Sequence, residues 1–160
     1  MDRHADRSQL NRRGFAGALL GVTAAAALAR TGSAVAAPAK TMQVYKSPTC
    51  GCCARWVDYV RADGWKVEVL DLQNVTSIKK QVGLLPQLAS CHTAIVDGYV
   101  VEGHVPLPAI EKLMAERPDV HGIAVPGMPQ DSPGMGGGGV QDVFAFTRDG
   151  DTRLFARTAG

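Results

Sequence analysis

Alternating hydrophobic and polar positions mark several short strands in the middle of the chain. Residues 42–46 and 66–72 alternate in this way, and each segment is followed by turn-forming residues. Residues 93–96 and 99–102 are rich in β-branched and aromatic side chains, and Asp97-Gly98 separates them. Asp-Gly between two such segments is typical of a tight hairpin turn, so we expect two single strands and one β-hairpin.

Other stretches repeat at helical spacing. The segment that ends at Gly64 places apolar side chains such as Trp56 and Val60 on one face, which predicts an amphipathic helix. Residues 75–82 predict a short helix. Residues 108–117 begin with a proline and are followed by a second one, as is typical of a bounded helix.

The last forty residues are different in composition. Residues 122–139 are rich in proline and glycine, so we expect a long ordered loop or mobile flap without a packed element. Residues 140–147 and 152–156 predict one more hairpin. The order strand, helix, strand, helix, hairpin, helix is the thioredoxin arrangement. We therefore expect an α/β, thioredoxin-like mixed sheet flanked by helices, with a C-terminal loop and hairpin extension.

The first 36 residues have the features of an export signal. Arg12 and Arg13 stand directly before an apolar, alanine-rich run, and Ala34-Val35-Ala36 offers the small residues that a signal peptidase accepts. Paired arginines suggest the twin-arginine route. We expect a signal peptide over residues 1–36, a single domain over residues 37–160 and a periplasmic location. A disordered basic tail is the alternative.

The charge balance excludes some classes of partner. Residues 1–36 hold five of the 17 basic and two of the 15 acidic residues, which leaves 12 and 13 in the expected domain. A nucleic-acid surface would need a basic stripe, which this domain lacks, so we expect no nucleic-acid partner. The sequence has no second long hydrophobic run, so we expect no stable membrane insertion after cleavage.

The most informative motif is Cys50-Gly51-Cys52-Cys53, between a predicted strand and a predicted helix. Backbone N–H groups and the dipole at a helix start stabilise thiolates, which are both the nucleophiles of disulfide exchange and ligands for soft metals. A dithiol oxidoreductase needs only two sulfurs, here Cys50 and Cys53, and a third thiol would compete in the exchange. A metal centre gains from each added thiolate, so we favour metal binding and keep the oxidoreductase as the alternative.

The start of the predicted hairpin carries further candidate ligands. Cys91 and His92 precede its first strand, and His104 follows its second. Because the two strands run antiparallel, these three residues should meet at one corner, next to the cysteine motif. The alternative is that Cys91 forms a disulfide with one of the other three cysteines, which an exported protein would allow.

Two methionines influence the choice of metal. Met128 and Met135 lie in the proline- and glycine-rich segment, where a core role is not obvious. Thiolate and thioether ligands select Cu(I), whereas thiolates and imidazoles also suit zinc. We therefore expect copper, as Cu(I), and keep a structural zinc site as a further alternative.

Several separate motifs stand out along the chain: Ser47-Pro-Thr-Cys-Gly-Cys-Cys, Ser90-Cys-His-Thr-Ala, Asp97-Gly-Tyr-Val-Val-Glu-Gly-His-Val-Pro, Val125-Pro-Gly-Met-Pro and Ser132-Pro-Gly-Met. Together they resemble the CopG-type copper-resistance family, whose members are exported thioredoxin-like proteins. The resemblance covers roughly residues 42–135. It implies copper binding at the Cys-x-Cys-Cys turn, with Cys91 and nearby His or Met residues assisting.

The sequence thus predicts a periplasmic copper-binding protein that serves copper resistance or homeostasis. Its partners would be copper ions and other periplasmic copper-handling proteins. We assign no catalytic residue, although copper redox cycling would make the protein a copper-centred oxidoreductase. The expected metal ligands are Cys50, Cys52, Cys53, Cys91, His92, His104, Met128 and Met135.

Overall fold

The computed structural model describes residues 40–160, which form a sheet of seven strands with three α-helices and one 3-10 helix. In chain order the elements are β1 (Thr41–Lys46), α1 (Gly51–Ala62), β2 (Lys66–Asp71), α2 (Thr76–Gln81), η1 (Pro86–Leu88), β3 (Thr93–Val96), β4 (Tyr99–Glu102), α3 (Leu107–Glu116), β5 (Gly122–Ala124), β6 (Gln141–Phe146) and β7 (Thr152–Thr158). The expected signal peptide, residues 1–36, lies outside the described residues. Within the described part, no helix has the length and hydrophobicity needed to cross a bilayer.

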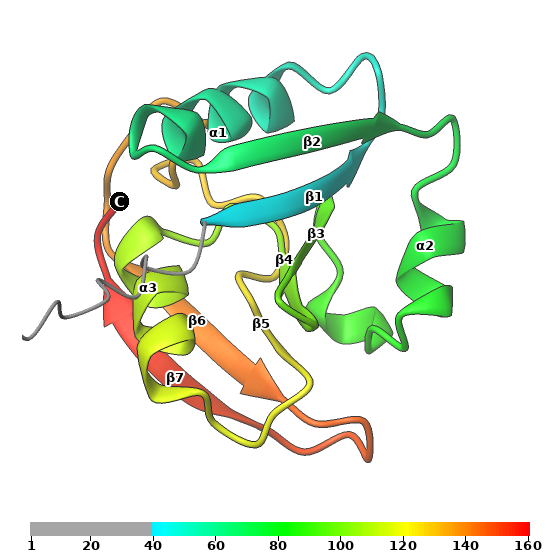
Figure 1. Ribbon diagram of the computed structural model, residues 1–160, viewed down its shortest axis with the longest axis vertical. Helices are drawn as coiled ribbons and strands as arrows, with labels where there is room; N and C mark the ends of the chain where they lie inside the picture. Colours follow the sequence, from blue (N-terminus) through cyan, green and yellow to red (C-terminus); the bar gives the residue numbers. More distant parts are fainter. Residues whose placement is uncertain (1–39) are drawn as a thin grey trace, which may run out of the picture. The chain divides into compact units, whose positions relative to one another are not determined.

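The strands follow the order β2-β1-β3-β4-β5-β6-β7 in one mixed sheet (Figure 1). β1 pairs with β2 in parallel, which requires a crossover, and α1 supplies it. β3 pairs antiparallel with both β1 and β4, so the β3–β4 hairpin lies in the middle of the sheet. The expected α/β architecture, a strand–helix–strand unit followed by a hairpin and a helix, is confirmed.

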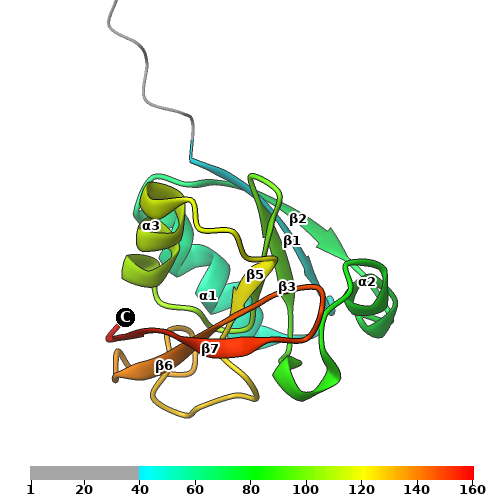
Figure 2. The same cartoon turned by 90° about the horizontal axis from the view of Figure 1, so that it is seen from below.

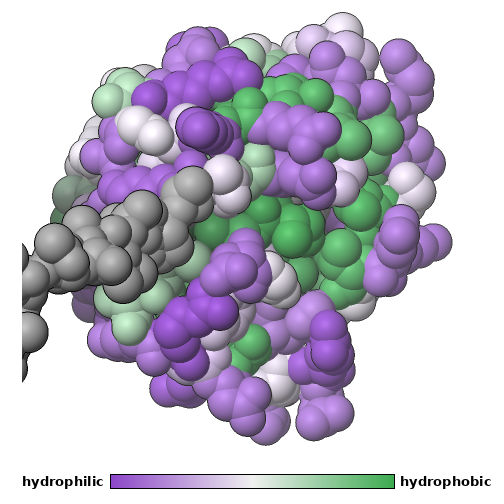
Figure 3. Space-filling view, in the orientation of Figure 1, coloured by the Kyte–Doolittle hydropathy of each residue, from purple (hydrophilic) through white to green (hydrophobic). Residues whose placement is uncertain are grey.

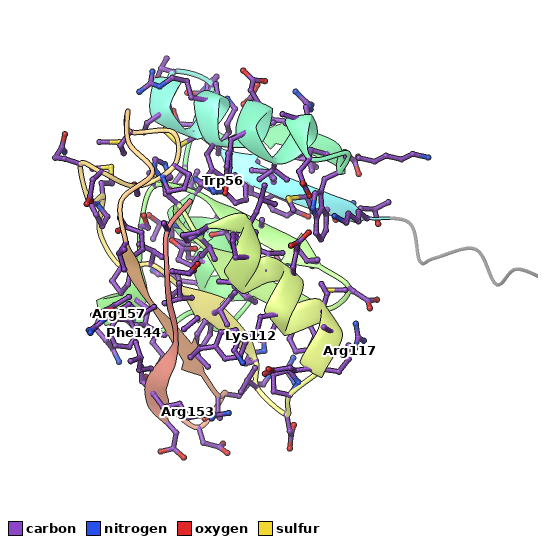
Figure 4. The ribbon with its side chains drawn as sticks, turned by 90° about the vertical axis from the view of Figure 1, so that its left-hand side faces the viewer. Trp56, Lys112, Arg117, Phe144, Arg153 and Arg157 are labelled. Carbon is purple, nitrogen blue, oxygen red and sulfur yellow. A yellow bond between two sulfur atoms is a disulfide. The ribbon has the colours of Figure 1, made fainter. Side chains whose placement is uncertain are left out.

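One face of the sheet packs against α1 and α3, which lie on the same side in Figure 2. α1 buries Cys53, Trp56, Val57 and Val60, which recur at the three- and four-residue spacing of one helix face. In Figure 4, Trp56 extends from α1 toward the interior, and its indole N–H donates to the Val105 carbonyl at 3.0 Å. This bond ties the helix that follows the cysteines to the segment after His104.

The opposite face is covered by the segment that contains α2 and η1, through Leu84 and Leu88. Alternate strand residues contribute to the two faces: Val101 packs with α1 and α3, whereas its neighbour Val100 packs with Leu84 and Leu88. This segment does not cover the whole face, because Figure 3 shows hydrophobic surface between β1 and α2.

The sequence predicts most elements to within two residues, including the β3–β4 turn at Asp97-Gly98 and the C-terminal hairpin. The third helix begins at Leu107, one residue before the expected Pro108. The prediction that residues 122–139 contain no packed element is wrong at its start. Gly122–Ala124 is β5, fully buried between β4 and β6. Three residues are too few to show a period, so only the neighbouring strands define this strand.

Candidate metal centre

Cys50 to Cys53 form a turn that enters α1, which we call the cysteine turn. Cys50 is the N-cap residue, with extended backbone, and Gly51 is the first helical residue. Cys50 and Cys53 are joined by a disulfide bond. Cys52 is free and half-buried, with its sulfur 3.5 Å from the Cys50 sulfur, whereas Cys53 is fully buried. In this turn Cys50 and Cys52 are therefore half-buried, whereas Cys53 is fully buried.

Cys91, His92 and His104 form a second group, which we call the hairpin corner. The Cys91 sulfur lies 3.2 Å from His104 Nε2 and 3.5 Å from His92 Nδ1. The β3–β4 register makes this possible, because it pairs Thr93 with Glu102 and so returns the chain to the same end of the hairpin. The Gly103 N–H then donates to the His92 carbonyl at 3.1 Å, which extends the pairing beyond the strands.

Gly103 is required for this close approach. Its φ is +77°, and a Cβ added there would lie 2.5 Å from the Val125 carbonyl oxygen and 2.6 Å from the Ser90 hydroxyl. A residue with a side chain would push His104 away from Cys91 or displace the segment that carries Val125. The glycine between Glu102 and His104 thus sets the spacing of the hairpin corner.

The cysteine turn and the hairpin corner converge. The ligand atoms of Cys50, Cys52, Cys53 and Cys91 all lie within 4.8 Å of one another. The same holds for a second set, Cys53, Cys91, His92 and His104. Two sulfurs that bind the same ion, each at about 2.3 Å from it, can be at most ~4.6 Å apart. Small movements would therefore bring these donors to a shared ion.

The donor chemistry fits a soft metal. Four sulfurs and two imidazoles are a set suited to copper or zinc, and no carboxylate belongs to either group. Cys50 and Cys53 can bind as thiolates only after their disulfide is reduced. His92 gives a further indication, because its buried Nε2 has no hydrogen-bond partner in the described part of the chain. Such an atom is costly unless something binds it.

Burial sets the protonation of the hairpin corner. Burial, and then the neighbouring Cys52, raises the pKa of the Cys91 thiol to about 11. Burial lowers the pKa of His104 to about 4, with a smaller contribution from the Arg55 charge. Burial, then the charges of His104 and Lys79, holds the pKa of His92 well below 6.5. At neutral pH both imidazoles are neutral, as metal ligands must be, and Cys91 would release a proton when it binds a metal.

Aromatic packing holds His92 in place. Its ring centroid lies 4.4 Å from that of Trp56 and 5.4 Å from that of His104. Because Trp56 is on the helix that starts at the cysteine turn, this packing couples α1 directly to the hairpin corner. Trp56 is a fully buried core residue, and it also forms a wall of the site.

A buried charged network supports the corner from the opposite side. Glu102 is fully buried and accepts hydrogen bonds from the Lys79 ammonium at 2.5 Å, the Thr93 hydroxyl at 2.6 Å and the Ser90 N–H at 2.6 Å. Lys79, 8% exposed, also donates to the Thr93 hydroxyl at 3.1 Å. Two of these partners flank Cys91 and His92 in sequence, so the network fixes the backbone that carries both ligands.

The segment after β5 closes one side of the site. In Figures 2 and 4 it passes beside one end of α1, and Arg55 Nε donates to the Gly134 carbonyl at 2.8 Å. Gly134 packs so closely that an added Cβ would lie 2.7 Å from the Cys52 carbonyl oxygen. Met135, next to it, is half-buried, whereas Met128 is 54% exposed. A copper role for these methionines stays a prediction.

The sequence hypotheses about cysteine pairing have different outcomes. The bridge in the structure is Cys50–Cys53, the pair that a dithiol oxidoreductase would use. The alternative that Cys91 forms a disulfide with one of the other three is wrong for this structure, since Cys91 is free. The prediction that Cys91, His92 and His104 meet near the cysteine turn agrees with the distances.

Sequence reasoning missed the residues that position the ligands. Lys79 and Glu102 were expected on a short helix and a strand, without a partner. A charged residue in a strand whose neighbours are all apolar could have indicated a buried ion pair. Ser132, which contacts His104, gave no separate signal beyond its place in a Ser-Pro-Gly-Met motif.

Comparison with known proteins adds to this picture. A family model described as a protein of unknown function, DUF411, matches residues 88–135, which include the hairpin corner. A solved structure of copper resistance protein copG, Form 1, is 39% identical, covers 75% of this chain and 98% of its own, and has a TM-score of 0.68. Form 2 of that protein gives the same identity and TM-score, with 73% and 96% coverage. No curated protein sequence gives a significant match.

Proposed function

Since the chain belongs to the CopG-type copper-resistance family, we propose that it binds copper, as Cu(I), in the service of copper resistance or homeostasis. One observation carries the proposal: sulfurs and imidazoles from the cysteine turn and the hairpin corner lie within 4.8 Å of one another in two overlapping groups. Cys53 and Cys91 belong to both groups, so they can bridge one ion to the next.

We place the protein in the periplasm, after removal of residues 1–36 through the twin-arginine route. This location agrees with the paired Arg12-Arg13 and with the Cys50–Cys53 disulfide. Other copper-handling proteins of that compartment would deliver or accept the copper.

Each part of the site has its own task in binding. An external dithiol that reduces the Cys50–Cys53 disulfide supplies two electrons and two protons, is itself oxidised to a disulfide, and frees two thiols beside Cys52. Cys91 gives up its proton as it binds, and the neutral imidazoles of His92 and His104 bind without proton loss at neutral pH. The half-buried Cys50 and Cys52 offer the entry side, whereas Cys53 and the histidines form the buried end.

The test is an anaerobic titration of the reduced protein with Cu(I) against a tight competing chelator. We expect the protein to remove copper from the chelator. Cys52→Ser and Cys91→Ser should each lower the Cu(I) affinity. Because each removes a ligand, the loss should exceed the about 10–100-fold that removal of a residue supporting a ligand costs. Ser77→Ala, on the exposed side of α2, is the matched control and should bind like the wild type. If the wild-type protein takes no copper from the chelator, the proposal fails.

The disulfide itself favours a second function, thiol–disulfide exchange by Cys50 and Cys53. In that reaction the two thiols reduce a substrate disulfide and become the bridge seen here. The electrons could instead pass to copper: oxidation of the two thiols releases two electrons and two protons, and two Cu(II) ions accept one electron each. An insulin-reduction assay tests the exchange function, which requires Cys52→Ser to stay active in that assay. The Cu(I) titration tests the copper function, which requires Cys52→Ser to be impaired in copper binding.

A further inference from the structure

Ser132 is the buried polar residue that reaches the hairpin corner from outside it. It lies between β5 and β6, its side chain is fully buried, and its hydroxyl oxygen is 3.1 Å from His104 Nδ1. The other ring nitrogen, Nε2, lies 3.2 Å from the Cys91 sulfur. His104 is therefore held between a hydroxyl on one side and a thiol on the other.

The protons of this chain of groups can be assigned by counting. The Ser132 hydroxyl has one proton and two neighbours: the Pro129 carbonyl oxygen at 2.7 Å, which can only accept, and His104 Nδ1 at 3.1 Å. We assign the proton to the shorter contact, with the carbonyl oxygen. The hydroxyl oxygen can then only accept from His104, so Nδ1 carries the ring proton. A neutral imidazole has a single N–H, and Nε2 is therefore the atom with the free lone pair.

The geometry points to Ser132 as a positioning residue that fixes His104 as the Nδ1–H tautomer and so presents Nε2 as the metal-binding atom beside Cys91. In metal sites a histidine ligand commonly donates its second N–H to a supporting acceptor, which fixes the ring orientation. Here the acceptor comes from 28 residues further along the chain, in the proline- and glycine-rich segment. The copper part of this inference rests on the proposed function, whereas the tautomer does not.

Ser132 is itself held firmly. Its N–H donates to the Pro129 carbonyl at 3.0 Å, and its own carbonyl accepts from the Met135 N–H at 3.0 Å. Two residues further on, the Gly134 carbonyl accepts from Arg55 on α1. The serine is thus fastened to the same helix that starts at the cysteine turn, which makes the contact with His104 part of the frame of the site.

The direct test is NMR of the metal-free protein with ¹⁵N-labelled histidine, at a pH where the rings are neutral. The protonated and unprotonated ring nitrogens resonate far apart, so the spectrum reports the tautomer. We expect wild-type His104 to be protonated at Nδ1, and we expect Ser132→Ala to shift it toward the Nε2–H form. A wild-type ring protonated at Nε2 would overturn the inference, and this arm needs no variant to fold.

Copper affinity provides the second readout, with a matched control. Gln141 tethers the same segment by donating to Asp131 at 3.0 Å and to the Gly139 carbonyl at 3.2 Å, without touching His104. We expect Ser132→Ala to lower Cu(I) affinity by about 10–100-fold, and Gln141→Ala to leave the tautomer unchanged and the affinity near that of the wild type. Equal losses in the two variants would mean that the segment only packs, and would contradict the inference.

Failure of the proposed function can be told apart from failure of this inference. If the wild-type protein binds no copper, the copper function is lost, but an Nδ1–H tautomer that depends on Ser132 would still establish the positioning role. If copper binds tightly and Ser132→Ala changes neither the tautomer nor the affinity, the copper function stands and the inference is wrong.

Discussion

The cysteine turn and the hairpin corner contribute to the same site, yet they are built in opposite ways. The turn is a continuous stretch of four residues at a helix start, half-exposed, with two of its sulfurs in a disulfide. The corner is assembled from residues 13 apart, and it buries both histidines fully while Cys91 is half-buried. Glu102 and Lys79 support it on one side and Ser132 on another.

This difference indicates a division of work. A local, half-exposed turn can change its bonding, for example by opening its disulfide, without disturbing the core. A buried corner cannot rearrange cheaply, because each of its polar groups would lose a hydrogen bond that water cannot replace. We infer that the corner is the fixed half of the centre and the turn the adaptable half. The following predictions test that contrast.

The largest effect is expected at the charged network under the corner. Glu102→Gln leaves the Lys79 ammonium buried beside a neutral group, and removal of one partner of a buried ion pair costs about 3–5 kcal/mol of folding free energy. Urea unfolding of the metal-free protein measures this. Lys79→Met and Glu102→Gln combined should cost less than Glu102→Gln alone, because the unpaired charge is then gone. A single variant as stable as the wild type would refute the fixed-corner interpretation.

The second-largest effect is expected from acid, which should lower the stability of the fold through the two histidines of the hairpin corner. In the metal-free fold the pKa of His104 is lowered to about 4 and that of His92 lies well below 6.5, so between these values the unfolded chain binds more protons than the folded one. Stability is therefore lost as the pH falls below 6.5, by up to about 1.4 kcal/mol per pH unit for each histidine. Denaturant unfolding from pH 7 to 4.5 checks this. His104→Gln should give a shallower loss, and an identical slope would contradict the assignment.

The smallest effect is expected at the ion pair beside the cysteine turn. Lys46 is as buried as Lys79 and donates to Asp71 at 2.8 Å and to the Ser47 carbonyl at 3.1 Å, but the Asp71 side chain is 51% exposed whereas that of Glu102 is fully buried. Asp71→Asn should cost no more than about 1 kcal/mol, because water can take over the exposed partner's role. Measured in the same urea series, a cost equal to that of Glu102→Gln would remove the contrast between the two regions.

Some parts of the candidate site and of the fold could be predicted from the sequence, and others could not. Cys50, Cys52 and Cys53 form a local motif, so their convergence follows from the chain itself. The meeting of Cys91 with His104 could be predicted too, because an Asp97-Gly98 turn makes the hairpin register countable. β5 could not, since a strand of three residues owes its existence to β4 and β6 on either side.

The sequence by itself determined the α/β element order, the cysteine motif and the residues that the hairpin brings together, because these depend on local periodicity and turn chemistry. Only the tertiary structure decided which groups support the ligands. The Glu102–Lys79 pair and the Ser132–His104 contact join segments 23 and 28 residues apart. Such contacts arise because buried polar groups must find partners wherever the packed chain supplies them, and no local pattern encodes that choice.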